Sequence, residues 1–471
     1  MGNFYKVLLQ KKKELEEKES EELRKQLSRK PKKANLKPKR EKISLHLGID
    51  FGTSFTKVCY RDLNSEESVF IHFDEWENGF IPSLVYYTPS DDKIHFHKPS
   101  SNEVIEVPYL KMMLAGMEKP PKKMTFDHVI ACSVRFLAEV IRMSKKNALK
   151  QSPDRFRNLS ESWTGISLGV PVQYLETETE DLFRKILFVA DLMADTGKKL
   201  PSEINDILDL YQKYKDEAEK VRNKLYVYPE IIAAVYSFIL SREARSGCYT
   251  YFDVGGGTLD GILFGYRNLN GSRLVEVFEG RVKPLGVEKI SYRLLREAND
   301  LSNFRKIRAA LYEEGKYDLE VKIPMYNNII MNDIQTHVAE VIFPMKKKVS
   351  PVLIQDSDRL PLFIGGGGAA SPWFQNTIEQ TYESRNHMSC GLPPYEKRGM
   401  DFPVDFILDK TAKCWDFCRY AIAYGLSFPP DEELKIEGLP KDARDIETAE
   451  QTESLNEKCD SIAFDLYGEH M

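Results

Sequence analysis

The sequence predicts an α/β protein, and two observations lead to this fold class. First, two pairs of apolar strands each contain an aspartate followed by a glycine turn: GIDFGTSFTKV begins at Gly48 and FDVGGGTLDGI begins at Phe252. Second, stretches with helical periodicity separate and follow these two strand pairs. Two copies of one unit that face each other would place an aspartate and a glycine turn on either side of a cleft.

The expected elements follow in an order typical of this class. The first half has a hairpin over 43–62, a strand over 80–87, helices over 126–146 and 177–195 with a short strand at 166–174 between them, a charged helix over 202–224 and a buried helix over 228–240. The second half has the strands of the second glycine motif, helices over 288–312 and 331–345, a strand, turn and helix over 359–382, a loop-like stretch over 381–404 and a helix over 411–426.

The two ends of the chain differ in charge from its middle. Residues 1–45 carry 15 Lys and Arg against 7 Glu, whereas residues 429–471 carry 13 Asp and Glu against 4 Lys and Arg. We expect 1–42 to be a charged helical arm with a basic linker, because its Lys- and Pro-rich part can bury little surface. We expect 429–471 to be an acidic, mobile tail, since it shows little apolar periodicity.

Composition and cysteine usage bound the class of protein and its partners. The chain has 471 residues, 42% hydrophobic and 30% charged, with a net charge of −5. Seven scattered cysteines and a polar N-terminus lead us to expect reduced thiols, no signal peptide and a cytoplasmic location. Apolar runs stay below the roughly 18 residues of a membrane helix, so no membrane partner is expected. Nucleic acid would bind only through the basic arm.

The glycine turns indicate a phosphate site. Successive backbone N–H groups form a nest for phosphate oxygens, and the missing β-carbons let the chain approach a phosphate closely. Asp50 and Asp253, at the ends of their strands, are placed to hold Mg²⁺ through its waters. Thr53, Ser54 and Thr258 can donate hydroxyl groups to phosphate or position a water molecule. Positioning and charge neutralisation of this kind are what phosphoryl transfer requires.

Three motifs carry a resemblance to a known superfamily. GIDFGTSFTKV, FDVGGGTLDGI and LFIGGGGAASP at 362–372 resemble the first phosphate, second phosphate and adenosine motifs of the actin-like ATPases. The resemblance is strongest to the nucleotide-binding domain of the 70-kDa heat-shock chaperones, over about 45–428. It implies two ribonuclease-H-like lobes around a central nucleotide cleft, with lobe I at 43–243 and lobe II at 244–428.

Shorter segments fall in the same order as in these chaperones. PYLKMMLAG resembles the segment with the catalytic lysine, which places that role on Lys111, and PEIIAAVY resembles the connecting helix, with its carboxylate at Glu230. PLGVEKI resembles the glycine-rich turn after a hairpin, with Gly286 and Glu288. Only about 43 residues follow Phe428 in this sequence, too few for the peptide-binding β-sandwich of the chaperones.

The resemblance implies three sets of site residues. The catalytic set is Lys111, Glu230, Asp253, Thr258 and Asp260, of which Lys111, Thr258 and Asp260 would position or activate the attacking water. The metal set for Mg²⁺ is Asp50, Asp253 and, through water, Glu230. The set for ATP or ADP is Asp50, Gly52, Thr53, Ser54, Phe55, Gly255, Gly256, Gly257, Thr258, Gly286, Glu288, Arg305, Arg308, Gly365, Gly366 and Gly367.

The leading functional hypothesis is a heat-shock-70-like ATPase that hydrolyses ATP slowly. Its ATP/ADP switch would act on a protein partner of unknown identity, in a chaperone-like or regulatory role. A filament-forming relative of the bacterial actins is the alternative, and ATP-dependent pelleting would identify it. A small-molecule kinase of the same fold needs a base and a substrate segment that we do not find. A scaffold that no longer hydrolyses nucleotide and an oligomeric state also remain open, because fold alone does not fix function.

Overall fold

The computed structural model describes residues 41–438 with gaps. The residues outside the description in this range are 77, 102, 157–158, 172–173, 175–176, 198, 222–223, 241–243, 270–271, 299–323, 350–358, 409–415 and 431–433. The predicted arm and most of the predicted tail therefore lie outside the described residues, as do Arg305 and Arg308.

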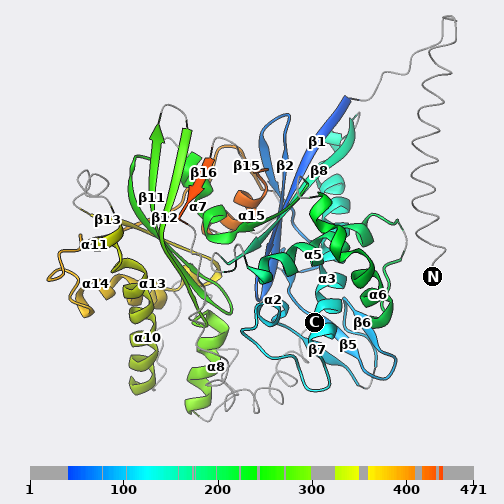
Figure 1. Cartoon of the computed structure of the whole chain (residues 1–471), viewed down its shortest axis with the longest axis horizontal. Helices are drawn as coiled ribbons and strands as arrows, with labels where there is room; N and C mark the ends of the chain where they lie inside the picture. Colours follow the sequence, from blue (N-terminus) through cyan, green and yellow to red (C-terminus); the bar gives the residue numbers. More distant parts are fainter. Residues whose placement is uncertain are drawn as a thin grey trace, which may run out of the picture. The chain divides into compact units, whose positions relative to one another are not determined.

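A seven-stranded sheet forms the core of the first half of the chain (Figure 1). Its strands are β1 (Glu41–Phe51), β2 (Phe55–Asp62), β3 (Glu67–Phe70), β4 (Ile81–Pro82), β8 (Leu159–Val170), β9 (Leu225–Pro229) and β15 (Phe406–Ile407). The spatial order is β15-β3-β2-β1-β8-β9, with β4 paired to β2. β1 and β2 are antiparallel, which confirms the hairpin predicted over 43–62.

Helices and a small sheet accompany this first sheet. They are α2 (Leu110–Leu114), α3 (Phe126–Gln151), α4 (Pro153–Phe156), α5 (Glu178–Ala194), α6 (Ile204–Tyr214), the 3₁₀ helix η2 (Lys215–Val221), and the strands β5 (Val85–Thr88), β6 (Lys93–His95) and β7 (Ile105–Val107). The Thr125 hydroxyl accepts a hydrogen bond from the His128 amide and caps α3. α3 and α5 confirm the helices predicted at 126–146 and 177–195.

A six-stranded sheet forms the core of the second half. Its strands are β10 (Gly247–Val254), β11 (Leu259–Leu269), β12 (Ser272–Lys283), β13 (Leu360–Gly365), β14 (Tyr395–Arg398) and β16 (Leu434–Glu437), in the order β14-β13-β10-β11-β12-β16. Its helices are α8 (Val287–Ala298), α10 (Pro324–Ile342), α11 (Met345–Lys348), the 3₁₀ helix η4 (Gly367–Ala370), α13 (Pro372–Glu379) and α14 (Thr381–Ser384). One face packs against α10 and α13 through a core that includes Phe252, Leu263, Val338 and Phe374.

Two helices cross between the sheets, which belong to one compact unit of the chain. α7 (Glu230–Leu240) packs on the second sheet, where the ring of Phe238 lies 4.9 Å from the rings of both Tyr249 and Phe363. α15 (Ala421–Leu426), which follows the 3₁₀ helix η5 (Phe417–Arg419), packs on β2 and β3 of the first sheet. The helices touch at Gly425, where a β-carbon would lie 1.9 Å from the Ala233 carbonyl oxygen, so only glycine fits.

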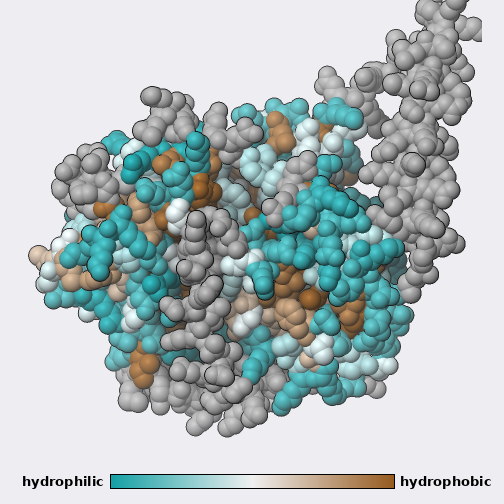
Figure 2. Space-filling model, in the orientation of Figure 1, coloured by the Kyte–Doolittle hydropathy of each residue, from teal (hydrophilic) through white to brown (hydrophobic). Residues whose placement is uncertain are grey.

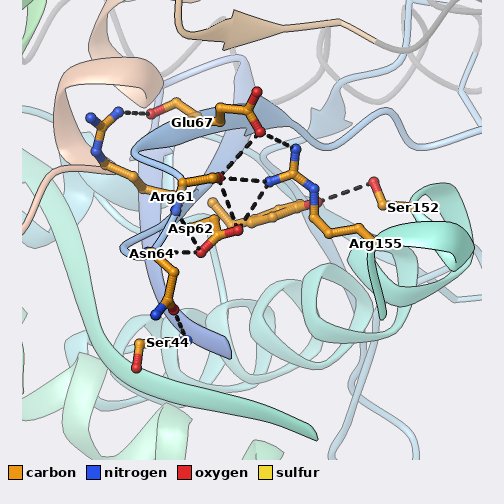
Figure 3. Close-up of polar contacts among 10 residues, drawn as sticks. Ser44, Arg61, Asp62, Asn64, Glu67, Ser152 and Arg155 are labelled. Carbon is orange, nitrogen blue, oxygen red and sulfur yellow. Dashed lines mark hydrogen bonds and ion pairs between the residues drawn. The ribbon is translucent and has the colours of Figure 1, made fainter. Parts of the chain in front are cut away.

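Arg155 joins α4 to the turn between β2 and β3. Figure 3 shows its guanidinium between two carboxylates: Nη1 lies 3.3 Å from Asp62 Oδ2 and Nη2 lies 2.5 Å from Glu67 Oε2. Asp62 also accepts hydrogen bonds from the backbone amides of Asn64 and Ser65, which holds the turn closed. This network fixes the far end of the first hairpin, opposite its glycine turn.

The α/β class is confirmed, and several local expectations need correction. The single strand predicted over 80–87 is two strands, β4 and β5, which belong to different sheets. The predicted tail contains β16, which pairs parallel with β12 through its apolar–charged alternation and fills an open sheet edge. The stretch 381–404 contains α14 and β14, since Tyr395–Arg398 pairs with β13. Of the helix predicted over 411–426, residues 411–415 lie outside the described residues, and the described α-helix begins at Ala421, after the 3₁₀ helix η5.

On the face drawn in Figure 2, hydrophobic side chains lie in small groups among hydrophilic ones. Across the described ranges, none of the helices is long and apolar enough to cross a bilayer.

Candidate functional site

The first glycine turn connects β1 and β2 beside a buried aspartate. Asp50 lies opposite Lys57 in the hairpin register, and Lys57 Nζ donates a hydrogen bond to Asp50 Oδ2 over 2.5 Å. A β-carbon at Gly52 would lie 2.4 Å from the Phe55 carbonyl oxygen, so the turn requires glycine there. The buried Ser54 hydroxyl has no hydrogen-bond partner among the described residues.

The second glycine turn connects β10 and β11 and brings two carboxylates together. Asp253 and Asp260 lie directly opposite each other in the antiparallel register. The Oδ1 atom of each is buried without a hydrogen-bond partner in the described part of the chain. Like charges in such a pair destabilise a sheet unless a cation or a proton intervenes.

The pKa values of this pair reflect that placement. Burial raises the pKa of Asp253 to about 8, and the negative charge of Asp260 adds to the effect. Burial also raises the pKa of Asp260 to about 6, while Lys111 and a hydrogen bond from Thr258 oppose the rise. A divalent cation would favour the ionised carboxylates and lower both values, so the pair is suited to a metal ion.

The backbone of the second turn has its carbonyl groups and its amides directed to different partners. The amides of Gly286, Val287 and Glu288 donate to the carbonyl oxygens of Gly257, Gly255 and Gly256, over 3.2, 3.0 and 2.8 Å. α8 therefore begins directly on the turn. By contrast, the amides of Gly256 and Gly257 donate to no group within the described ranges.

Gly286 and Glu288 thus support the turn from behind. A β-carbon at Gly286 would lie 2.5 Å from the Gly256 carbonyl oxygen, which explains why glycine is required there. Glu288 is buried, with 1% of its surface exposed. Both residues lie against the backbone of the turn. The amides of Gly256 and Gly257 therefore stay available to bind phosphate oxygens.

The first and second turns meet. A β-carbon at Gly257 would lie 2.4 Å from Met112 Sδ and 2.8 Å from Thr53 Cγ2. Thr53 belongs to the first turn and Met112 to α2, so three segments far apart in sequence converge on one glycine. The structure brings together the two motifs that the sequence predicts to face each other.

Lys111 and Glu230 form a buried ion pair beside the turns. Lys111 Nζ, on α2, donates hydrogen bonds to both carboxylate oxygens of Glu230, the first residue of α7. Burial lowers the pKa of Lys111, but the charge and hydrogen bonds of Glu230, together with the charges of Asp260 and Asp50, raise it overall. Burial raises the pKa of Glu230 against the opposing effect of Lys111. Both groups that the resemblance assigns to catalysis are engaged with each other in this conformation.

The third glycine motif lies next to the second. β13 runs parallel to β10 with Gly365 opposite Asp253. Gly366 has a φ of +82°, and a β-carbon there would lie 2.7 Å from Asp253 Oδ1, so both conformation and space require glycine. Gly367 begins η4, which precedes α13. The motif encloses the unpartnered oxygen of Asp253.

Some predicted site residues are not brought into this cluster. Arg305 and Arg308 lie outside the described residues. The ring of Phe55 packs at 6.4 Å from that of Phe80, a contact within the first half of the chain. In the part of the chain that is described, no three His, Cys, Asp or Glu side chains gather as a direct metal site. A magnesium ion held here would need water and phosphate oxygens to complete its shell.

The structure also adds residues that sequence reasoning missed. Lys57 could have been found, because a turn over 52–54 places it opposite Asp50 in a hairpin. Met112 and Gly169 had no such signal. A β-carbon at Gly169, on β8, would lie 2.6 Å from Glu230 Cγ, so this glycine makes room for the ion pair.

The sequence matches no protein-family model and no curated protein. What the site can do follows from its groups: two carboxylates with unpartnered oxygens, two unbonded glycine amides, hydroxyl groups of Thr53, Ser54 and Thr258, and a protonated lysine. Carboxylates suit a hard cation, and turn amides with a lysine suit phosphate oxygens. The donor set fits a magnesium-bound phosphate ligand.

Proposed function

We propose that the chain is an actin-like ATPase of the heat-shock-70 type. It binds ATP or ADP with Mg²⁺ at the paired glycine turns, hydrolyses ATP slowly and acts through the resulting change of shape on a protein partner. The observation that carries this proposal is the contact between Thr53 and Gly257, which joins two aspartate-ended hairpins that lie far apart in the sequence.

Each of the site residues has a role that follows from its chemistry. Asp253 and Asp50 hold the cation, and the amides of Gly256 and Gly257 bind phosphate oxygens. The bound Mg²⁺ neutralises phosphate charge. When nucleotide binds, Lys111 and Glu230 give up part of their contact with each other and contact the ligand instead. Because Lys111 lies on α2 and Glu230 on α7, nucleotide binding is coupled to the positions of these two helices.

A cytoplasmic location accompanies the proposal. The cysteines at 59, 132, 248, 390 and 418 are free thiols in the described part of the chain. Reduced cysteines are the usual state in that compartment.

The test is magnesium-dependent nucleotide binding by the purified full-length chain. Binding of fluorescent ATP and ADP analogues and release of phosphate would be measured for the natural protein and for Asp253→Ala. We expect Asp253→Ala to weaken magnesium-dependent binding at least about tenfold, equivalent to about 1.4 kcal/mol. Asp209→Asn, which alters an exposed carboxylate on α6, is the matched control and should change nothing.

Two results would overturn the proposal. One is a natural protein that binds neither ATP nor ADP with Mg²⁺. The other is an Asp253→Ala variant that binds and turns over ATP as the natural protein does. A pull-down in the ATP and ADP states would then identify the partner whose binding follows the nucleotide.

A further inference from the structure

The chain crosses between the two large sheets through a short connection that ends in a turn at 404–405. β14 pairs with β13 of the second sheet up to Arg398, opposite Phe363. β15 pairs with β3 of the first sheet from Phe406, opposite Ser68. We propose that residues 395–407, the tether, limit how far the two sheets can separate.

One end of the tether is anchored by a partly buried polar network. Asp405 Oδ2 accepts a hydrogen bond from Arg61 Nη1 over 2.7 Å, and its Oδ1 accepts one from Tyr424 Oη over 2.9 Å. The Asp405 carbonyl oxygen also accepts from the Ser68 amide over 2.8 Å. The Arg61 guanidinium lies 3.8 Å from the centroid of the Phe428 ring. Figure 3 shows Arg61 pointing away from Arg155, so its charge serves the tether and not the α4 network.

Aromatic packing reinforces this end. The ring of Phe406 lies 5.5 Å from that of Phe417, 5.6 Å from that of Tyr420 and 5.7 Å from that of Tyr424. These residues belong to η5 and α15 or the residue between them. Pulling β15 from the first sheet would therefore break the charge-assisted hydrogen bonds of Asp405 and the ring packing of Phe406 at the same time.

The other end is held by four residue pairs between β14 and β13 and by Tyr395, whose hydroxyl lies 2.6 Å from His387 Nδ1. Lys397 pairs with Glu379 on α13 over 2.8 Å, but their side chains are 43% and 37% exposed. Arg398 pairs only with Glu396 of its own strand among the ion pairs of the described residues. Exposed pairs of this kind contribute little to an anchor. The β14 end is therefore held by its backbone pairing and by Tyr395 and not by its ion pairs.

Space beside β14 allows it to move. A cavity of about 430 Å³ is lined by Phe238, Phe363, Glu396, Arg398, Gly399 and Asp401. A β-carbon at Gly399 would meet no atom within 4 Å. At about 3.5 Å per residue, the chain from Arg398 to Phe406 reaches at most about 28 Å when fully extended. This length sets the upper limit on separation of the two sheet edges while both strands stay paired.

The tether bears on the proposed function because separation of the sheets would open the contact between the two glycine turns. This consequence rests on that function, but the mechanical role of the tether does not. A tether that limits separation should allow wider separation when it is lengthened, with both anchors intact.

The experiment lengthens the tether in the full-length protein. Six Gly and Ser residues are inserted after Gly399, and the matched control carries the same insertion after Gly391, an open loop position outside the tether. Distances between spectroscopic labels on unnatural amino acids at Asp209 and Asn328 are measured by pulsed electron resonance. We expect the distribution to shift to longer distances for the insertion after Gly399 and to stay unchanged for the control.

A second variant tests the anchor. Asp405→Asn should speed hydrogen exchange at the Ser68 amide, whereas Asp401→Asn, at an exposed position on the tether, should not. Equal distance distributions for the two insertions would overturn the proposal that the tether limits separation. Equal hydrogen exchange at the Ser68 amide in the two Asn variants would do the same. Neither readout needs nucleotide, so longer distances in a protein that binds no ATP would contradict the proposed function alone.

Discussion

Lys289 Nζ donates a hydrogen bond to the Glu118 carboxylate, and this ion pair joins α8 to the segment that follows α2. The two side chains are 23% and 15% exposed. The same ammonium group lies 5.3 Å from the centroid of the Tyr109 ring, at the start of α2. One lysine therefore contacts both ends of the helix that carries Lys111, and it does so from the helix that begins on the second glycine turn.

Charge reversal should show what this pair contributes. Glu118→Lys or Lys289→Glu alone should destabilise the protein by about 1–3 kcal/mol, because each leaves a partly buried charge beside a like charge. The double reversal should recover most of the loss, measured by urea unfolding. Glu103→Lys, which breaks the exposed pair with Lys123, should cost under about 1 kcal/mol. Absence of recovery in the double variant would contradict the pairing.

A methyl group at Gly257 should separate the two turns. Gly257→Ala places a β-carbon against Met112 and Thr53, and overpacking of this kind costs about 1–3 kcal/mol. Nucleotide binding should weaken together with unfolding stability. Gly399→Ala has open space around it and should leave both unchanged. A Gly257→Ala protein as stable as the natural one would show that the turns are not in contact in solution.

Breaking the Lys111–Glu230 pair should cost more than removing both charges. Lys111→Met leaves a buried carboxylate without its partner, and such changes cost about 3–5 kcal/mol. Adding Glu230→Gln should restore part of that stability, since no uncompensated charge remains. Urea unfolding of the single and double variants measures the difference. A double variant less stable than Lys111→Met would contradict this account of the pair.

Two buried histidines should make the protein acid-sensitive. Burial lowers the pKa of His46, which is hydrogen-bonded to Ser167 over 2.8 Å, to about 3. Burial, aided by Lys283 and Arg281, lowers the pKa of His337 to about 3. The unfolded chain binds more protons between about pH 3 and 6.5, so the protein loses stability as the pH is lowered through that window.

The size of the effect is testable at a single site. Between pH 7 and pH 5, each histidine should remove about 2 kcal/mol of unfolding free energy. His46→Gln should reduce the pH dependence of the unfolding free energy, measured by urea unfolding, by that amount, whatever it does to stability at pH 7. His97→Gln, at an exposed position, is the control. An unchanged pH dependence in His46→Gln would show that His46 is not buried in its neutral form.

The glycine hairpins and the long helices could be predicted from sequence because their signals are local. Apolar alternation ending in Asp50 or Asp253 sets the strands, and a 3.6-residue period sets α3 and α5. β15 and β16 are two and four residues long, and they form only because an edge of β3 or β12 is available. Tertiary pairing of this kind leaves almost no trace in so short a segment.

The sequence predicts individual residues of the candidate site but not the contacts between them. Glycines at Gly52 and Gly366 follow from turn geometry, so the motifs name them directly. The Lys111–Glu230 ion pair joins residues 119 apart, and no spacing rule connects them. The start of α8 is held on the second turn by hydrogen bonds between backbone groups. Every residue carries such groups, so the sequence does not indicate this contact.

Each large sheet is covered by a helix from the other part of the chain, and this arrangement has a consequence for how the chain folds. α7, encoded with the first sheet, covers the second, and α15, encoded with the second, covers the first. Cutting the gene near codon 244 would give two polypeptides, each with an apolar sheet face stripped of its helix. Neither should be soluble alone, but the two made together should reassemble by trading helices. Synthesis on the ribosome faces the same constraint, because the face of the first sheet that α15 covers stays exposed until α15 has emerged.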